Sequence, residues 1–348
     1  MIAKSNNNFP EINQDGLLKA RVIAEHRELY QVRTSSHEYF AKVTGKQMHE
    51  ASSREDYPAV GDWVLVEALP NDQAIIKKIL PRKTVIKKRQ SEGKIQIIAA
   101  NVDVVFIVES IDRDYNLNRL ERYCTLCLEQ KIKPVVIISK IDLIRSDELD
   151  AKLAEIKKRL KDVDVIPTSI STPEDLQKLK SFVQKDITYC FLGSSGVGKS
   201  SMINKLIGGE IIRTGEIGEQ SGRGKHTTTR RDMFFLENGG ILIDNPGMRE
   251  VGLADFESGI GQVFNDIATV ASQCKFADCT HISEPGCAVL EALKSGQLDK
   301  DQYENYLRLK KEVDHFDMSE QEKREKDRKF GKFIKKSLKT LDEIDRYK

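Results

Sequence analysis

The chain has 348 residues, which is long enough for two or three domains that each bury their own hydrophobic core. Positive and negative side chains nearly balance, with a net charge of +2, so any affinity for nucleic acid must come from local basic patches and not from the charge of the whole protein. No apolar run approaches the length of a membrane span, and the first residues lack the basic and apolar regions of a signal peptide, so we expect a cytoplasmic protein without a membrane partner.

Residues 1–92 are predicted to form a small β-barrel, because short apolar segments from about Gly16 to Arg89 alternate with polar turns. Five short strands favour an OB-fold, whose surface commonly binds nucleic acid, over an SH3-like barrel. A basic edge at the end of this region either contacts RNA or forms the solvated face of a strand. It comprises Lys77, Lys78, Arg82, Lys83, Lys87, Lys88 and Arg89.

Residues 93–254 are predicted to form a second domain. From Asn101 onward, strand and helix patterns alternate in it. Such alternation predicts an α/β domain in which helices cover both faces of a parallel sheet. Cys124 and Cys127 lie three residues apart on the first predicted helix, which favours core packing over redox or metal chemistry. Further along, the glycine-rich turn at residues 238–240 joins two strands in a predicted hairpin.

This domain contains a glycine-rich phosphate loop between an apolar strand and an amphipathic helix. The motif G-x-x-x-x-G-K-[ST] consists of Gly193, Ser194, Ser195, Gly196, Val197, Gly198, Lys199 and Ser200, and Ser201 follows as a further nucleotide contact. Its glycines permit positive φ angles, so that successive backbone N–H groups can face one anion at a helix N-terminus. Lys199 is predicted to reach the β- and γ-phosphates, and Ser200 to bind Mg²⁺.

Two loops at the ends of predicted parallel strands carry residues suited to reading guanine. The first, Ser139-Lys140-Ile141-Asp142, resembles the N/T-K-x-D motif of GTPases, in which the carboxylate accepts hydrogen bonds from the guanine N1–H and N2 amine. The second, Ser169-Ile170, resembles the loop that also touches guanine, so GTP is favoured over ATP. Ser139 replaces the usual asparagine, and its shorter side chain is expected to affect the affinity for the base.

The second strand of the predicted hairpin ends in Asp244-Asn245-Pro246-Gly247, which resembles the D-x-P-G switch motif. Asp244 is expected to hold Mg²⁺ through water, and the Gly247 N–H to sense the γ-phosphate. Thr227, Thr228 and Thr229 offer the threonine that closes over Mg²⁺, and we favour Thr228. The guanine-reading strands precede the phosphate loop, whereas they follow it in ordinary small GTPases. The sequence therefore predicts a circularly permuted GTPase domain.

Residues 255–348 are predicted to form a mainly helical domain that holds one structural zinc ion. The spacing C-x4-C-x-H-x5-C supplies three thiolates and one imidazole, from Cys274, Cys279, His281 and Cys287. Four protein ligands leave no position for water, which is typical of structural zinc, while buried core cysteines are the alternative. The basic segment from Lys323 to Lys339 is either a solvated helix or an RNA contact.

The permuted order, the D-N-P-G and H-T-T-T segments, the zinc-ligand spacing and the N-terminal barrel together resemble the RsgA family of ribosome biogenesis GTPases. The resemblance extends from about Gly16 through the zinc segment. It implies a protein that binds GTP and GDP with Mg²⁺, docks on the small ribosomal subunit and its rRNA during late maturation, and hydrolyses GTP when the subunit stimulates it. We expect a monomer.

Hydrolysis without a partner is expected to be slow. Ras-like enzymes orient the attacking water with a glutamine directly after the D-x-x-G motif, and here that position is Met248, which has no suitable donor or acceptor. The resemblance assigns this role to His226, which joins Lys199 and Thr228 as an expected catalytic residue; an exposed loop histidine without a catalytic part is the alternative. The alternative function is an rRNA-binding checkpoint factor in which GTP gates docking and hydrolysis is incidental. Asp142 disfavours a P-loop ATPase or kinase.

Overall fold

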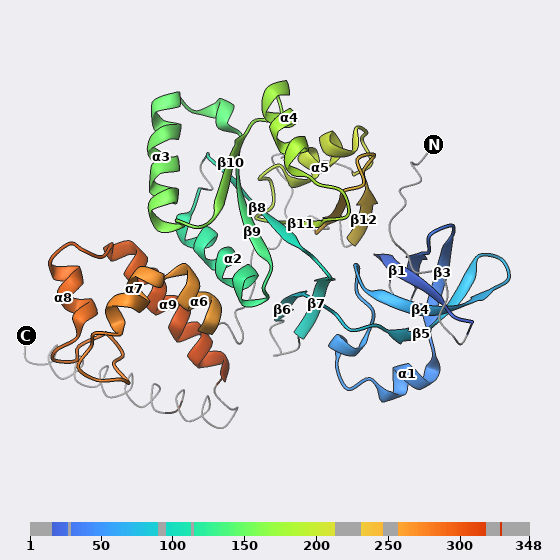
Figure 1. Cartoon of the computed structure of the whole chain (residues 1–348), viewed down its shortest axis with the longest axis horizontal. Helices are drawn as coiled ribbons and strands as arrows, with labels where there is room; N and C mark the ends of the chain where they lie inside the picture. The colour runs from blue at the N-terminus through green and yellow to red at the C-terminus, as the bar shows by residue number, and fades with distance from the viewer. Residues whose placement is uncertain are drawn as a thin grey trace, which may run out of the picture.

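The computed structural model describes residues 16–26, 29–89, 95–112, 115–212, 231–245, 257–317 and 328. Along the molecule in Figure 1, an N-terminal barrel is followed by a central sheet with its helices and by a C-terminal helical region. This three-part architecture is the one that the sequence predicts. No helix within the described ranges is long and apolar enough to cross a bilayer.

Five strands close the N-terminal barrel. They are β1 (Leu18–Glu25), β2 (Tyr30–Arg33), β3 (Glu38–Val43), β4 (Trp63–Leu69) and β5 (Gln73–Ile79). Their order is β1-β2-β3-β5-β4 with a return to β1, and β3 pairs parallel with β5. A short helix, α1 (Gly45–Glu50), and a turn, η1 (Arg54–Asp56), lie between β3 and β4. This closed Greek-key barrel confirms the OB-type fold over the SH3-like alternative.

The basic edge at the end of the barrel is partly neutralised. Three of its members form ion pairs with acidic residues of the barrel: Lys77 with Glu67 (2.6 Å), Arg82 with Asp62 (2.7 Å) and Lys87 with Glu55 (2.7 Å). Because Asp62 is fully buried, the pair with Arg82 is part of the fold, whereas the other two pairs lie at the surface and leave RNA contact and a solvated strand face both open for the basic edge.

A two-stranded antiparallel sheet links the barrel to the central domain. It consists of β6 (Val85–Arg89) and β7 (Ile95–Ala100). The sequence pattern did not reveal this pairing, and the expected domain boundary at residue 92 falls between the two strands. β7 leads directly into the first strand of the central sheet.

The central domain is built on six strands in the order β10-β9-β8-β11-β13-β12. Their bounds are β8 (Val104–Ser110), β9 (Lys133–Ser139), β10 (Asp164–Thr168), β11 (Thr188–Leu192), β12 (Arg231–Phe235) and β13 (Ile241–Asp244). The first five in this order are parallel, and β12 is antiparallel to β13 because the two form the predicted hairpin. Every residue of β8 is buried, as expected for a strand covered on both faces.

Helices cover both faces of this sheet. They are α2 (Leu117–Glu129), α3 (Ser146–Arg159), α4 (Pro173–Phe182) and α5 (Lys199–Ile207), with a 3₁₀ turn, η2 (Ile141–Leu143), after β9. Side chains of α2 and α3 share one hydrophobic cluster with alternate residues of the sheet, and those of α4 and α5 share the other. Cys124 and Cys127 are fully buried in the first cluster, which confirms their packing role.

The C-terminal region packs against α2 and α3. Its helices are α6 (Glu257–Val263), α7 (Asn265–Ala271), α8 (Ala288–Lys294) and α9 (Lys300–Asp317). Gly259 of α6 approaches α2 so closely that a Cβ there would lie 2.3 Å from the Thr125 carbonyl oxygen. At a second contact, the fully buried Glu121 of α2 accepts hydrogen bonds from Arg159 of α3 at 2.6 Å and from Asn305 of α9 at 2.5 Å. These close and fully desolvated contacts join the helical region to the central domain.

Candidate nucleotide and metal sites

The phosphate loop connects β11 to α5, as its motif predicts. Gly193, Gly196 and Gly198 have φ angles of 145°, 83° and 98°, and α5 begins at Lys199. A Cβ at Gly193 would lie 2.2 Å from the Val108 carbonyl oxygen, so only glycine fits beside β8. Ser194, Ser195 and Val197 lie in the loop, and Ser200 and Ser201 in the first turn of α5. The loop is therefore followed directly by a helix N-terminus, where an anion is favoured.

Lys199 and Asp244 form the charged centre of this site. Burial lowers the pKa of Lys199 to about 8, although the negative charge of Asp244 opposes the shift. Burial also raises the pKa of Asp244 to about 6, against the attraction of Lys199 and with some repulsion from Asp232. Bound phosphate oxygens would stabilise the positive charge of Lys199, and a bound divalent cation would stabilise the negative charge of Asp244.

Asp244 keeps an unused acceptor in the interior. Its side chain is 6% exposed at the end of β13, and its Oδ1 has no hydrogen-bond partner among the described residues. A buried carboxylate oxygen without a partner is costly, and a hydrated Mg²⁺ would supply donors to it. The donor set of Ser200 and Asp244 thus fits a magnesium ion held mainly by oxygen and water.

Lys199 is held inside the phosphate loop. Its Nζ donates to the carbonyl oxygens of Gly193 at 2.8 Å and Ser194 at 2.5 Å. Neutral carbonyls are weaker acceptors than phosphate oxygens. The ammonium group is therefore already positioned within the loop and can exchange these carbonyls for a nucleotide.

Ser139 ties the candidate guanine-reading loop to the phosphate loop. It is buried at the end of β9, and its Oγ lies 2.7 Å from the Val197 carbonyl oxygen and 3.3 Å from that of Glu109. The sequence indicated only that a serine reaches less far than an asparagine. It did not show that the hydroxyl would find an acceptor on the phosphate loop.

Removing this tether is expected to weaken guanine-nucleotide binding. Ser139→Ala should raise the Kd for GDP by about fivefold, since a hydrogen bond of this kind contributes about 1 kcal/mol. Fluorescent GDP titration measures the effect. Ser181→Ala is the matched control, because Ser181 is exposed on α4 and its hydroxyl donates to the Lys178 carbonyl of the same helix. Equal GDP affinity in both variants would contradict the assigned role of Ser139.

The remaining candidate base-reading residues lie at the expected strand ends. Lys140 adopts a left-handed backbone conformation with φ of 59°, and its Nζ pairs with Asp112 at 2.9 Å. Asp142 is exposed in η2, beside the partly buried Ile141. Its carboxylate is open to a ligand and would become buried only when a base covers it.

The second candidate base-reading loop follows β10. Ser169 is buried, with its backbone N–H donating to Asp175 at 3.1 Å, and Ile170 follows it half-buried. The Ser171 N–H also donates within the loop, to Ser169 Oγ at 3.2 Å, so the backbone N–H of Ile170 is the donor between them that a base could use.

Several expected residues lie outside the described ranges. They are His226, Thr227, Thr228, Thr229, Gly247, Met248 and, apart from Arg328, the basic segment Lys323 to Lys339. Their predicted roles stay predictions.

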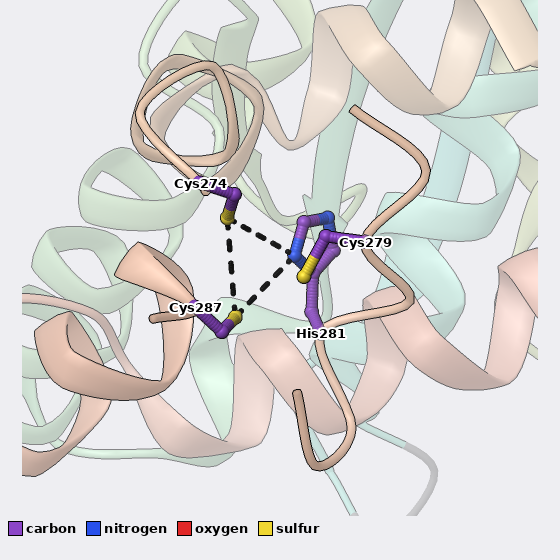
Figure 2. A group of neighbouring side chains, drawn as sticks. All are labelled: Cys274, Cys279, His281 and Cys287. Carbon is purple, nitrogen blue, oxygen red and sulfur yellow. Dashed lines mark hydrogen bonds between the residues drawn. The ribbon is translucent and has the colours of Figure 1, made fainter. Parts of the chain in front are cut away.

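The C-terminal region gathers the four predicted metal ligands into one cluster. Figure 2 shows Cys274, Cys279, His281 and Cys287 pointing toward a common centre, and their ligand atoms all lie within 4.8 Å of one another. The Cys274 and Cys287 sulfurs are each 3.6 Å from His281 Nδ1 and 3.9 Å from each other. A tetrahedron with Zn–S bonds of about 2.3 Å and a Zn–N bond of about 2.0 Å has edges of about 3.5–3.8 Å. The donor set and its spacing therefore fit zinc.

The loop that carries His281 is held from two sides. The Glu284 carboxylate accepts backbone N–H bonds from Thr280 at 3.0 Å and from Ile282 at 3.1 Å, and Tyr303 of α9 donates to the His281 carbonyl at 2.6 Å. His281 has a positive φ of 63°, which is uncommon for a residue with a Cβ and is maintained by these contacts. Burial, with the positive charge of Lys310, lowers the pKa of His281 and so favours the neutral form that binds metal.

The fold and the sites define a class: a circularly permuted phosphate-loop GTPase domain between an OB-type barrel and a candidate zinc region. The sequence model described as RsgA GTPase matches residues 79–254. A Bacteroides thetaiotaomicron protein named small ribosomal subunit biogenesis GTPase RsgA 1 is 40% identical over 309 residues, which cover 87% of this chain and 85% of that protein. The chain belongs to the RsgA GTPase family.

Other relatives and solved structures agree. An Oceanobacillus iheyensis protein, also named small ribosomal subunit biogenesis GTPase RsgA 1, is 39% identical and covers 90% of both chains. The crystal structure of YjeQ from Thermotoga maritima matches with a TM-score of 0.63 at 25% identity, over 84% of this chain and 96% of that one. The structure of YloQ, described as a circularly permuted GTPase, matches with a TM-score of 0.61 at 23% identity, over 87% of this chain and 97% of that one, and supports the permuted fold.

Proposed function

We propose that this protein binds the small ribosomal subunit and hydrolyses GTP to GDP and phosphate during late maturation of that subunit, with hydrolysis stimulated by the subunit. The observation that carries the proposal is the nucleotide site itself. A buried lysine and a buried carboxylate, one of whose oxygens has no hydrogen-bond partner among the residues that the structure describes, lie at a phosphate loop, which Ser139 ties to the candidate guanine-reading loop. The names of relatives that align over most of the chain support the small subunit as partner.

In this proposal the chain's own residues bind and orient the substrate. Lys199 and the glycine-rich backbone hold the β- and γ-phosphates, and Lys140 and Asp142 hold the base. Ser200, Thr228 and Asp244 would hold Mg²⁺, which neutralises charge on the phosphates when bound. His226 would orient the attacking water.

The domains divide this work. We propose a first boundary near residue 80 and not at 92, because β6 pairs with β7 and the family match begins at residue 79. The OB-type barrel and the zinc region would contact the subunit and its rRNA, and the central domain would read the nucleotide. We further propose that the protein acts as a monomer in the cytoplasm.

The test is GTP turnover by the purified protein with and without small ribosomal subunits, using large subunits as the control. Stimulation of at least about tenfold by small subunits alone is expected. Tight GTP-dependent docking with unchanged turnover would contradict the enzyme and support a nucleotide-gated rRNA-binding checkpoint factor instead.

His226→Ala is expected to lower subunit-stimulated turnover by about a hundredfold, while the Kd for GTP stays nearly unchanged, because a water-orienting group acts on the reaction step and not on nucleotide binding. Single-turnover GTP hydrolysis on saturating small subunits measures the loss. His49→Ala, in the barrel helix α1, is the matched control. Equal stimulated rates in the His226 variant and the wild type would remove His226 from the mechanism.

A further inference from the structure

One strand, β1, belongs to both the barrel and the central sheet. Its first half, Leu18–Arg21, pairs with β4, whereas Ala24 and Glu25 pair with Asp232 and Arg231 of β12. The register of β1 against β2 shifts between Val22 and Ala24, which marks a β-bulge. The bulge divides the strand between two cores, since Val22 packs in the barrel and Ile23 in the central domain.

Side chains of the barrel also contact both ends of β12. Arg231 Nη1 donates to Glu25 Oε2 at 3.0 Å, and both side chains are largely buried, with 14% and 28% exposed. At the other end, the Arg33 guanidinium lies 4.4 Å from the ring centre of Phe235. The strand that would otherwise form the edge of the central sheet is thereby attached to the barrel at both its ends.

The position of β12 affects the candidate metal site. Asp232 lies directly opposite Asp244 in the β12–β13 register. Directly paired residues of an antiparallel ladder have Cβ atoms about 4.5–5.5 Å apart, so the two carboxylates act on each other electrostatically. Asp244 is the buried group whose Oδ1 has no partner among the described residues. Any displacement of β12 along the barrel changes the surroundings of that oxygen.

We propose that Glu25 and Arg231 are positioning residues for the metal-binding carboxylate Asp244. The β12–β13 register places Asp232 opposite Asp244, and the ion pair fixes β12, and thereby this pair of carboxylates, against the barrel. The proposal rests on the proposed nucleotide function. It gives the barrel a second task besides contacting the subunit, because a partner that shifts the barrel changes the magnesium site without touching it.

The experiment measures the Mg²⁺ dependence of fluorescent GDP release from the full-length protein alone. Glu25→Gln and Arg231→Gln are each expected to raise the Mg²⁺ concentration for half-maximal retention of GDP by about fivefold, and the double variant by no more than either single one, since paired residues are not additive. Arg231→Lys should recover part of the loss. Lys77→Gln with Glu67→Gln is the matched control, an ion pair of the same barrel away from β12.

The outcomes separate this proposal from the function on which it rests. Loss of thermal stability in the variants with an unchanged Mg²⁺ requirement would overturn positioning and leave only a structural ion pair. Multiplicative losses in the double variant would also overturn it. Failure of the wild-type protein to bind GDP would contradict both the positioning role and the proposed function. GDP binding without stimulation of turnover by small subunits would contradict only the subunit-stimulated reaction.

Discussion

Replacing Lys199 by alanine is expected to lower GTP turnover by at least about a hundredfold and to weaken GTP binding strongly, because the ammonium group is the positive charge that the loop brings to the phosphates. The side chain is only 6% exposed, and its two loop carbonyls keep it in place before a nucleotide arrives. Alanine removes this charge and also leaves the Gly193 and Ser194 carbonyls without their donor. Both effects act against phosphate binding.

The matched control is Lys205→Ala, because Lys205 lies exposed on the same helix, α5. GTP affinity and turnover on small subunits are measured for both variants, and circular dichroism checks that each one folds. Near-wild-type turnover in the Lys199 variant would contradict the assignment of the phosphate loop. An equal loss in both variants would point to damage of α5 and not to a lost phosphate contact.

The parts of this site that could be predicted from sequence are those that depend on local backbone geometry. The phosphate loop needs positive φ angles, and the three spaced glycines permit them. The glycine-rich turn at residues 238–240 likewise predicts the hairpin whose second strand ends in Asp244. The four metal ligands lie within fourteen consecutive residues, so their spacing alone brought them together. In each case the chain between the partners is short enough to determine the geometry.

Contacts between distant segments could not be predicted in this way. Glu121, Arg159 and Asn305 meet in the interior although up to 184 residues separate them, and no local pattern marks any of them. The same holds for Glu25 and Arg231, which are 206 residues apart. The β-bulge that divides β1 between two sheets could not be predicted either, because strand register depends on the neighbouring elements against which each strand packs. Such pairs are visible only in the assembled fold.

Loss of the metal cluster is expected to destabilise the C-terminal region and, with it, attachment to the small subunit. Cys279→Ser should lower bound zinc from one ion to near zero per chain and lower the Tm of this region by about 10 °C, corresponding to about 2 kcal/mol of unfolding free energy for a region of this size. The reason lies in the surrounding structure. His281 keeps a left-handed backbone conformation that is uncommon for a residue with a Cβ. The three sulfurs and one nitrogen lie within 4.8 Å of one another, and without a metal their mutual contacts stabilise the loop little.

Cys127→Ala provides the control, since Cys127 is a fully buried cysteine of α2 that is not among the four grouped metal ligands. It is expected to cost some stability through a small cavity but to retain its zinc. Zinc content is measured by metal analysis, unfolding by calorimetry, and subunit binding by cosedimentation. Full zinc content in the Cys279 variant would show that this thiolate is not a ligand. The ligand loop is joined to α9 by the Tyr303 hydrogen bond, so both are expected to lose their shape, and subunit binding with it, when the metal is lost. Loss of zinc with unchanged subunit binding would contradict this expectation and limit the role of the metal to local folding.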